Sequence, residues 1–146
     1  MTTIATSTAH DDASDLPQLP FPREGVLRYV NAGHNTQFVL RPHDLDRLTT
    51  TGMPLGLFAG HGYQERSVRL DPDDLIFFYT DGMVETENEA GQVWGVERLE
   101  ALLLSSATRD LDTVLGRLEA DVRSFRGRAE PLDDATMMAL RFGERL

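Results

Sequence analysis

Five apolar or aromatic residues follow one another without interruption at residues 75–79, where the sequence reads Leu-Ile-Phe-Phe-Tyr. A strand buried on one face alternates apolar and polar residues, whereas an unbroken apolar run is typical of a strand covered on both faces. The preceding segment, Asp-Pro-Asp-Asp at residues 71–74, has the composition of a tight turn. We therefore predict a central strand at residues 75–79.

Shorter β-rich runs lie before and after this segment. Residues 26–30 and 36–40 are rich in valine, leucine and aromatic residues, and the intervening Asn-Ala-Gly-His-Asn sequence is typical of a turn. We predict that these two runs form a β-hairpin. Further strands are expected at residues 45–49, 63–70 and 136–142.

Two segments have the period of an amphipathic helix. Residues 96–104 carry three leucines along one side, and Trp94 just before them is expected to anchor the helix, because an indole buries a large apolar area. Asp110 is a favourable N-cap for a second helix at residues 111–125. The apolar positions of this second helix recur every three or four residues, and they are Leu111, Val114, Leu115, Leu118, Val122 and Phe125. Together these elements predict an α+β fold of mostly antiparallel strands, with two helices packed on one face.

The beginning of the chain has a different composition. Thr, Ser, Ala and Asp dominate its first residues, and prolines at positions 17, 20 and 22 interrupt regular structure. We expect residues 1–22 to be a disordered tail or linker. The rest of the 146-residue chain, residues 23–146, is long enough for one domain with a buried core.

Composition excludes several classes of site and partner. The chain has no cysteine, so disulfides, zinc–thiolate sites and cysteine nucleophiles are excluded. It carries 24 acidic and 14 basic side chains, a net charge of −10, which would repel the phosphates of a nucleic acid. No apolar run is long enough to cross a bilayer, and no signal segment opens the chain. We therefore expect a cytoplasmic protein that contacts neither nucleic acid nor membrane.

Two acidic segments lie where predicted strands end or begin. Asp81 follows the central strand directly, and Gly82 after it permits a sharp turn. Asp133 and Asp134 stand just before the closing strand at residues 136–142. If the two strands are antiparallel neighbours, the end of one lies beside the start of the other. Asp81 and Asp133 would then meet at the same edge of the sheet.

Carboxylates gathered at one edge repel one another unless protons or cations intervene. Hard oxygen ligands favour Mg²⁺ or Mn²⁺ over zinc. Such cations acidify a coordinated water and screen phosphoryl charge, which phosphate-ester hydrolysis requires. The same residues also fit a purely structural interpretation, because Asp-Gly after a strand is a common turn and an aspartate before a strand often only caps a loop. On spacing alone, the structural interpretation is favoured.

Five motifs then occur in order: Asn-Ala-Gly-His-Asn at 31–35, Thr-Gly-Met-Pro-Leu-Gly at 51–56, Phe-Tyr-Thr-Asp-Gly-Met-Val-Glu at 78–85, Trp-Gly-Val-Glu-Arg-Leu at 94–99 and Asp-Asp-Ala-Thr at 133–136. This series resembles the SpoIIE/RsbU-type branch of the PPM metal-dependent protein phosphatases, over about residues 26–142. The resemblance implies the C-terminal part of an αββα sandwich with a centre of two Mn²⁺ or Mg²⁺ ions. It also implies hydrolysis of phosphoserine or phosphothreonine in a protein partner. By the same resemblance, Asp81 and Asp133 are the catalytic metal ligands, and Asp134 belongs to the metal site by orienting Asp133 or a bound water.

Related domains begin with further strands and an Asp/Gly motif that supplies another metal ligand, and no counterpart precedes Gly33 here. We therefore expect residues 23–146 to lack the family's N-terminal half. Two functions stay open. One is a phosphatase acting on a phosphorylated regulator of the anti-sigma-antagonist type in bacterial signalling. The other is a catalytically incomplete half that serves as a regulatory or protein-binding module. A homo-oligomer, or pairing with a complementing N-terminal half, would complete its sheet.

Overall fold

The computed structural model describes residues 25–56, 62–106 and 110–143. The tail predicted at residues 1–22 lies outside the described residues. The chain divides into two compact units, each described here by itself. Of the described residues, the first unit contains 25–34, 50–56 and 62–72, and the second contains 35–49, 73–106 and 110–143.

The first unit is built on a two-stranded antiparallel sheet. β1 (Gly25–Tyr29) pairs with β4 (Arg66–Leu70) along its whole length. The segment after β1 is tied to the segment around Thr51. The Asn31 carbonyl accepts a hydrogen bond from the Thr51 N–H (2.8 Å), and the Asn31 N–H donates to the Thr51 hydroxyl (2.9 Å). Both residues are buried, so these bonds replace the water that the polar groups lose.

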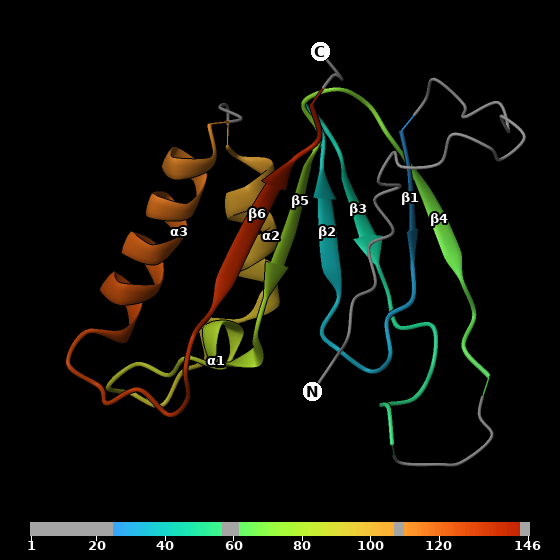
Figure 1. The fold of residues 1–146 in the computed structure, drawn as a ribbon. Helices are drawn as coiled ribbons and strands as arrows, with labels where there is room; N and C mark the ends of the chain where they lie inside the picture. Colours follow the sequence, from blue (N-terminus) through green and yellow to red (C-terminus); the bar gives the residue numbers. More distant parts are fainter. Residues whose placement is uncertain (1–24, 57–61, 107–109, 144–146) are drawn as a thin grey trace, which may run out of the picture. The chain divides into compact units, whose positions relative to one another are not determined.

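The second unit contains a four-stranded antiparallel sheet in the order β3–β2–β5–β6 (Figure 1). Its strands are β2 (Gln37–Leu40), β3 (Leu45–Leu48), β5 (Leu75–Tyr79) and β6 (Met137–Arg141). β5 has a neighbour along each edge, and four of its five residues are buried. The predicted central strand is therefore confirmed, and so is its antiparallel pairing with the closing strand.

The predicted hairpin between residues 26–30 and 36–40 is wrong. β1 pairs with β4, whereas β2 lies between β3 and β5. β2 is hydrogen-bonded to β3 along one edge and to β5 along the other, which leaves no edge for β1. The turn-type residues after β1 bind elsewhere. Asn31 pairs with Thr51, and its side chain accepts a hydrogen bond from the His34 N–H.

Two long helices follow the predicted pattern. α2 (Val96–Leu104) has the predicted bounds, and α3 (Leu111–Arg126) extends one residue further than expected. Asp110 caps α3 by accepting a hydrogen bond from the Thr113 N–H. Both helices cover one face of the sheet (Figure 1), where a single core contains Phe38, Phe77, Tyr79, Leu99, Leu103, Val114 and Leu118. The predicted α+β architecture is confirmed. None of the helices that the structure describes is long and apolar enough to cross a bilayer.

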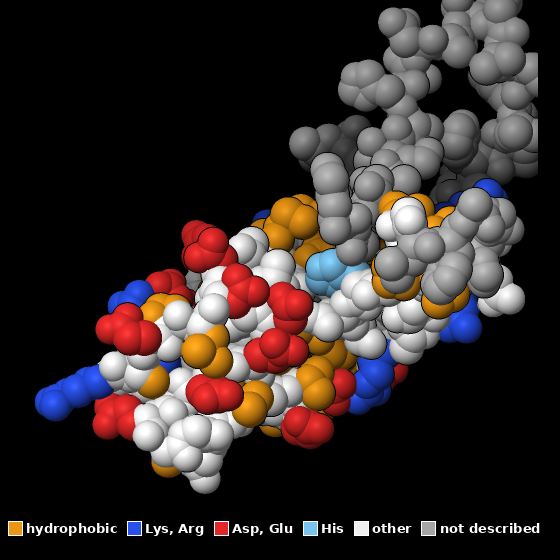
Figure 2. Space-filling view, turned by 90° about the horizontal axis from the view of Figure 1, so that it is seen from below, with side chains coloured by type: hydrophobic (Ala, Val, Ile, Leu, Met, Phe, Trp, Pro, Cys, Tyr) orange, Lys and Arg blue, Asp and Glu red, His pale blue; other side chains and the backbone are white. Residues whose placement is uncertain are grey.

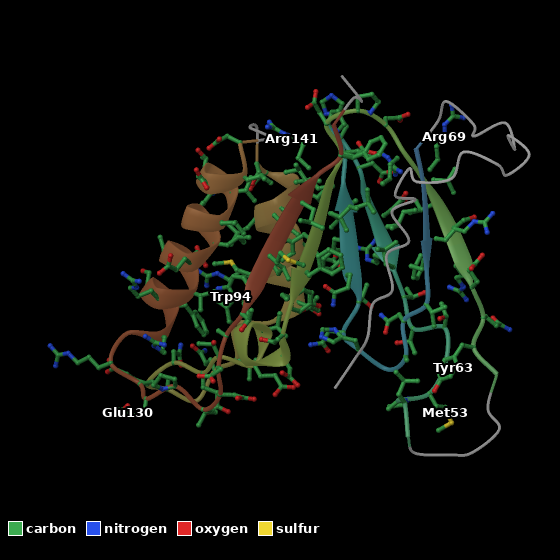
Figure 3. The ribbon with its side chains drawn as sticks, in the orientation of Figure 1. Met53, Tyr63, Arg69, Trp94, Glu130 and Arg141 are labelled. Carbon is green, nitrogen blue, oxygen red and sulfur yellow. The ribbon has the colours of Figure 1, made fainter. Side chains whose placement is uncertain are left out.

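Arg98 on α2 and Trp94 just before this helix both bind one carboxylate on α3. The Trp94 indole N–H donates to Asp121 Oδ1 (2.8 Å), and the Arg98 Nε donates to the same oxygen (2.6 Å). The Arg98 guanidinium also lies 5.1 Å from the centre of the Phe125 ring. The hydrogen bond from Arg98 is the main cause that holds the pKa of Asp121 below its ordinary value, and the bond from Trp94 adds to it. Trp94 is 4% exposed, which confirms its predicted role as an anchor (Figure 3).

We expect Asp121→Asn to lower the free energy of unfolding at neutral pH, and we expect this difference to shrink as the pH falls below about 4. A carboxyl whose pKa is depressed by folding stabilises the protein above its unfolded pKa, and this contribution is lost as the pH falls through the folded pKa. Urea unfolding of both proteins across this range measures the effect. Glu119→Gln is the control, because Glu119 pairs with Arg123 at the exposed surface and should contribute little. A loss that does not change with pH would contradict the role given to Asp121.

Candidate metal site

The C-terminal end of β5 lies beside the N-terminal end of β6 at one end of the sheet (Figure 1). The last paired residues of the strands are Tyr79 and Met137, which lie opposite one another. The pairing continues one residue further, because the Thr80 N–H donates to the Thr136 carbonyl (3.0 Å). The predicted arrangement, in which the end of β5 lies beside the start of β6, is therefore present.

The Thr80 side chain makes two more bonds to the segment before β6. Its hydroxyl donates to the Asp134 carbonyl (3.1 Å) and accepts a hydrogen bond from the Thr136 N–H (3.0 Å). These bonds hold the backbone of residues 134–136 against the end of β5. They also explain why a hydroxyl residue suits this position, since one group serves here as both donor and acceptor.

Gly82 allows the same two segments to approach even more closely. It lies in the short helix α1 (Asp81–Val84), which the sequence analysis did not predict. A Cβ atom added at Gly82 would lie 2.6 Å from the Asp134 carbonyl oxygen and 2.9 Å from its carbonyl carbon. Both contacts are with backbone, which cannot swing aside as a side chain can. Only glycine fits this position without a shift of the Asp134 segment.

The candidate ligands lie on either side of this contact. Asp81 is the exposed first residue of α1, and its Oδ1 accepts a hydrogen bond from the Gly82 N–H (3.1 Å). Asp133 is also exposed, and its Oδ1 accepts from the Asp134 N–H (2.7 Å). Among the described residues, no arginine pairs with Asp81, Asp133 or Asp134. Each backbone bond orients one carboxylate oxygen and leaves the other available to water or a cation.

The structure brings the two predicted loops together, but it does not show a complete set of metal ligands. The Asp81–Gly82 turn lies against the Asp134 backbone, as the pairing of the two strands requires. Within the ranges described above, however, no group of three or more His, Cys, Asp or Glu side chains could hold a metal ion. Asp81, Asp133 and Asp134 thus do not converge as a three-ligand set, and their roles as ligands stay predictions.

A pocket of about 270 Å³ lies beside the contact, and Asp133 and Asp134 form part of its wall. Three glutamates also line it: Glu85 and Glu87 follow α1, and Glu130 lies in the same loop as Asp133 and Asp134. Arg126, at the end of α3, is the one basic side chain in this lining. Figure 2 views the molecule from this end and shows acidic side chains gathered on it, and Figure 3 labels Glu130. The pocket is therefore strongly acidic, although Asp81 is not among the residues that line it.

Sequence reasoning missed the side-chain role of Thr80 and the contribution of Glu130. Thr80 was visible as a hydroxyl residue after an apolar run, but only the strand register reveals that it faces Thr136. Glu130 is distant in the sequence from Asp81 and Glu85, and no spacing rule links them. For Thr80, the position of the Asp134–Thr136 backbone was the missing information.

We expect Gly82→Ala to lower the free energy of unfolding by about 1–3 kcal/mol, because a side chain forced against backbone causes strain. Gly116→Ala is the matched control. Gly116 lies within α3, an added Cβ meets nothing within 4 Å, and alanine there should stabilise the protein by about 0.5–1 kcal/mol. Chemical denaturation of both variants measures the two effects. Equal stabilisation by both substitutions would contradict the close approach at Gly82.

A family profile described as Stage II sporulation protein E (SpoIIE) matches residues 19–143, which is most of the chain. The chain belongs to the SpoIIE family. The resemblance to the SpoIIE/RsbU-type branch of the PPM phosphatases is thereby confirmed. Protein IcfG of Synechocystis sp. (strain ATCC 27184 / PCC 6803 / Kazusa) is also similar to this SpoIIE-family chain, at 27% identity. That match covers 92% of this chain and 22% of IcfG.

Two solved structures share the fold of this SpoIIE-family chain. The SiaA-PP2C domain of Pseudomonas aeruginosa superimposes with a TM-score of 0.71 at 21% identity, over 80% of this chain and 46% of that one. The phosphatase domain of the cell fate determinant SpoIIE from Bacillus subtilis superimposes with a TM-score of 0.66 at 15% identity, over 99% of this chain and 58% of that one. The chain therefore has the fold of part of a PP2C-type phosphatase domain and spans about half the length of these relatives.

Proposed function

We propose that this SpoIIE-family chain binds Mn²⁺ or Mg²⁺ through Asp81 and Asp133 and serves in the hydrolysis of phosphoserine or phosphothreonine in a protein partner. The observation that carries the proposal is the contact between the Thr80–Gly82 turn and the Asp134–Thr136 segment. It holds two acidic loops at one end of the sheet. Neither loop has a basic partner for its aspartates among the described residues, so a cation would relieve their repulsion.

The chemistry of these donors fits a hard divalent cation. Asp81 and Asp133 offer oxygen atoms, which Mg²⁺ and Mn²⁺ prefer, whereas structural zinc sites are built mainly from cysteine and histidine. Two carboxylates do not fill an octahedral shell. Water or the phosphoryl group would supply the other oxygens.

The proposed roles follow from position. A divalent cation bound at this site would acidify a coordinated water and screen the charge of the phosphoryl group. Asp81 and Asp133 would hold the ion from two different loops, each with one oxygen already oriented by a backbone N–H. The Asp134 carbonyl accepts a hydrogen bond from the Thr80 hydroxyl, and Asp134 also lines the pocket. Its proposed role is to orient Asp133 or a bound water.

A phosphorylated protein fits this face better than a nucleic acid does. The lining of the pocket includes five carboxylates (Glu85, Glu87, Glu130, Asp133 and Asp134) and one guanidinium, that of Arg126. A polyanionic backbone would be repelled along such a surface. A single phosphoryl group would instead be attracted to the cations bound there. By analogy with the family, we propose a phosphorylated regulator of the anti-sigma-antagonist type, in bacterial signalling, as the substrate.

One observation favours a second function. Among its described residues, the chain contains no group of three His, Cys, Asp or Glu side chains that could hold a metal ion. It would then be a catalytically incomplete module that binds or regulates a partner. Alternatively, it would become active only in a homo-oligomer or with a complementing N-terminal half. Metal binding by the isolated chain separates these functions, because a module without a metal centre binds no Mn²⁺.

We expect the wild-type chain to bind Mn²⁺, and we expect Asp81→Asn and Asp133→Asn each to weaken that binding by more than about tenfold. An amide is neutral, so it attracts the cation less than a carboxylate does. Isothermal titration calorimetry measures the affinity. Mn²⁺-stimulated hydrolysis of p-nitrophenyl phosphate measures turnover, which both substitutions should abolish.

Asp112→Asn is the control for these two variants, because Asp112 is an exposed acid in the first turn of α3 and lines no part of the pocket. Its Mn²⁺ affinity should match the wild type. Full turnover and unchanged affinity in Asp81→Asn would refute the assignment. Absence of Mn²⁺ binding by the wild type would support the second function.

A further inference from the structure

We infer that Thr80 is a positioning residue: its hydroxyl allows the chain to leave β5 for the helix that carries Asp81 while the loop that carries Asp133 stays in place. This inference rests on the proposed function, because it concerns how the two proposed ligands are held. In this inference Thr80 acts through the backbone of the loop that carries Asp133, and it is not proposed as a ligand.

The argument begins with the hydrogen bonds of an antiparallel pair. Two residues in a hydrogen-bonded pair normally exchange both bonds, so each donates its N–H to the carbonyl of the other. Thr80 and Thr136 make the first of these bonds, from the Thr80 N–H to the Thr136 carbonyl (3.0 Å). The second bond would require the Thr80 carbonyl.

That carbonyl is already engaged in α1. It accepts a hydrogen bond from the Met83 N–H (3.1 Å), which closes the first turn after Thr80. The Thr136 N–H would therefore lose its partner at the point where β5 ends. The Thr80 hydroxyl takes the place of the carbonyl and accepts this N–H at 3.0 Å.

The same hydroxyl then reaches one step further along the acidic loop. It donates its proton to the Asp134 carbonyl (3.1 Å), so one oxygen atom binds the backbone on both sides of Ala135. In the described part of the chain, these are the side-chain hydrogen bonds that link residues 80–82 to residues 133–136. We call these two bonds of the Thr80 hydroxyl the clamp. Asp133 directly precedes Asp134, so the direction of the Asp133 side chain depends on the clamp.

Removal of the hydroxyl would leave a backbone N–H and a carbonyl without their protein partner, while the ladder bond from the Thr80 N–H would survive. The loop would then be tied to β5 by one hydrogen bond instead of three. Groups that orient metal ligands typically change metal affinity by about 10–100-fold when they are removed. We expect a loss of this size when the Thr80 hydroxyl is removed, although Thr80 is not a proposed ligand.

Thr80→Val tests the inference, because valine keeps the branched shape and removes only the hydroxyl, and Thr80→Ser restores the hydroxyl. We expect Thr80→Val to bind Mn²⁺ about 10–100-fold more weakly in calorimetry, and Thr80→Ser to bind within about threefold of the wild type. Amide hydrogen exchange at Thr136, followed by NMR, should be about three- to tenfold faster in Thr80→Val, because its N–H loses its acceptor.

Thr113→Val is the matched control. Thr113 also bonds through its hydroxyl to a nearby acceptor, Asp110, but it does so at the start of α3. This substitution should reduce stability without changing Mn²⁺ affinity or exchange at Thr136. A purely structural role for Thr80 predicts that both valine variants behave alike in the binding experiment.

The outcomes separate this inference from the proposed function. Unchanged exchange at Thr136 in Thr80→Val, or failure of Thr80→Ser to restore binding, overturns the role of the hydroxyl. If the wild type binds no Mn²⁺, the proposed function fails, and exchange at Thr136 still decides whether the clamp exists. If Thr80→Val does not fold, the wild-type hydroxyl proton replaces it as the readout. Slow exchange of that proton supports the clamp, and exchange as fast as in a free threonine contradicts it.

Discussion

The exchange of hydrogen bonds between Thr80 and Thr136 is the constraint on which the candidate site depends. The Thr80 N–H donates to the Thr136 carbonyl and extends the β5–β6 ladder by one residue. The Thr136 N–H donates in return to the Thr80 hydroxyl, and the Thr80 carbonyl is left for the first turn of α1. Gly82 lets the Asp134 backbone follow at a distance that no larger residue would permit. The contacts of Thr80 and Gly82 with residues 134–136 thus hold together the two acidic loops that carry the proposed ligands.

Charge distribution explains why such an end of the sheet would attract a cation. Three arginines of the second unit pair away from this pocket: Arg41 with Asp46 and Asp74, Arg47 with Glu100, and Arg98 with Asp121. These pairs tie the sheet and the helices together and leave Arg126 as the one basic residue in the lining of an otherwise acidic pocket. The protein thus concentrates negative charge where two loops meet, a state that a divalent ion would stabilise.

Features set by local composition could be predicted from the sequence. The unbroken apolar run indicated β5, and the period of apolar residues with Asp110 before them indicated α3. The choice of partner strands could not be predicted in the same way, because every strand has two edges and a turn-rich segment does not reveal which neighbour fills them. The β1–β2 hairpin failed for this reason. The ligand candidates could be predicted from the assumption that β5 and β6 are neighbours. The bonds of the Thr80 hydroxyl could not, because they depend on the register of the two strands, which composition does not reveal.

Paramagnetic broadening by Mn²⁺ tests the central claim most directly, because it reports where the ion lies without relying on turnover. Amide signals of the ¹⁵N-labelled chain would be recorded while MnCl₂ is added, with MgCl₂ as the diamagnetic reference. The account predicts that the signals of residues 80–86 and 133–136 broaden first and together. Broadening centred on another part of the chain, or none at millimolar Mn²⁺, would contradict it.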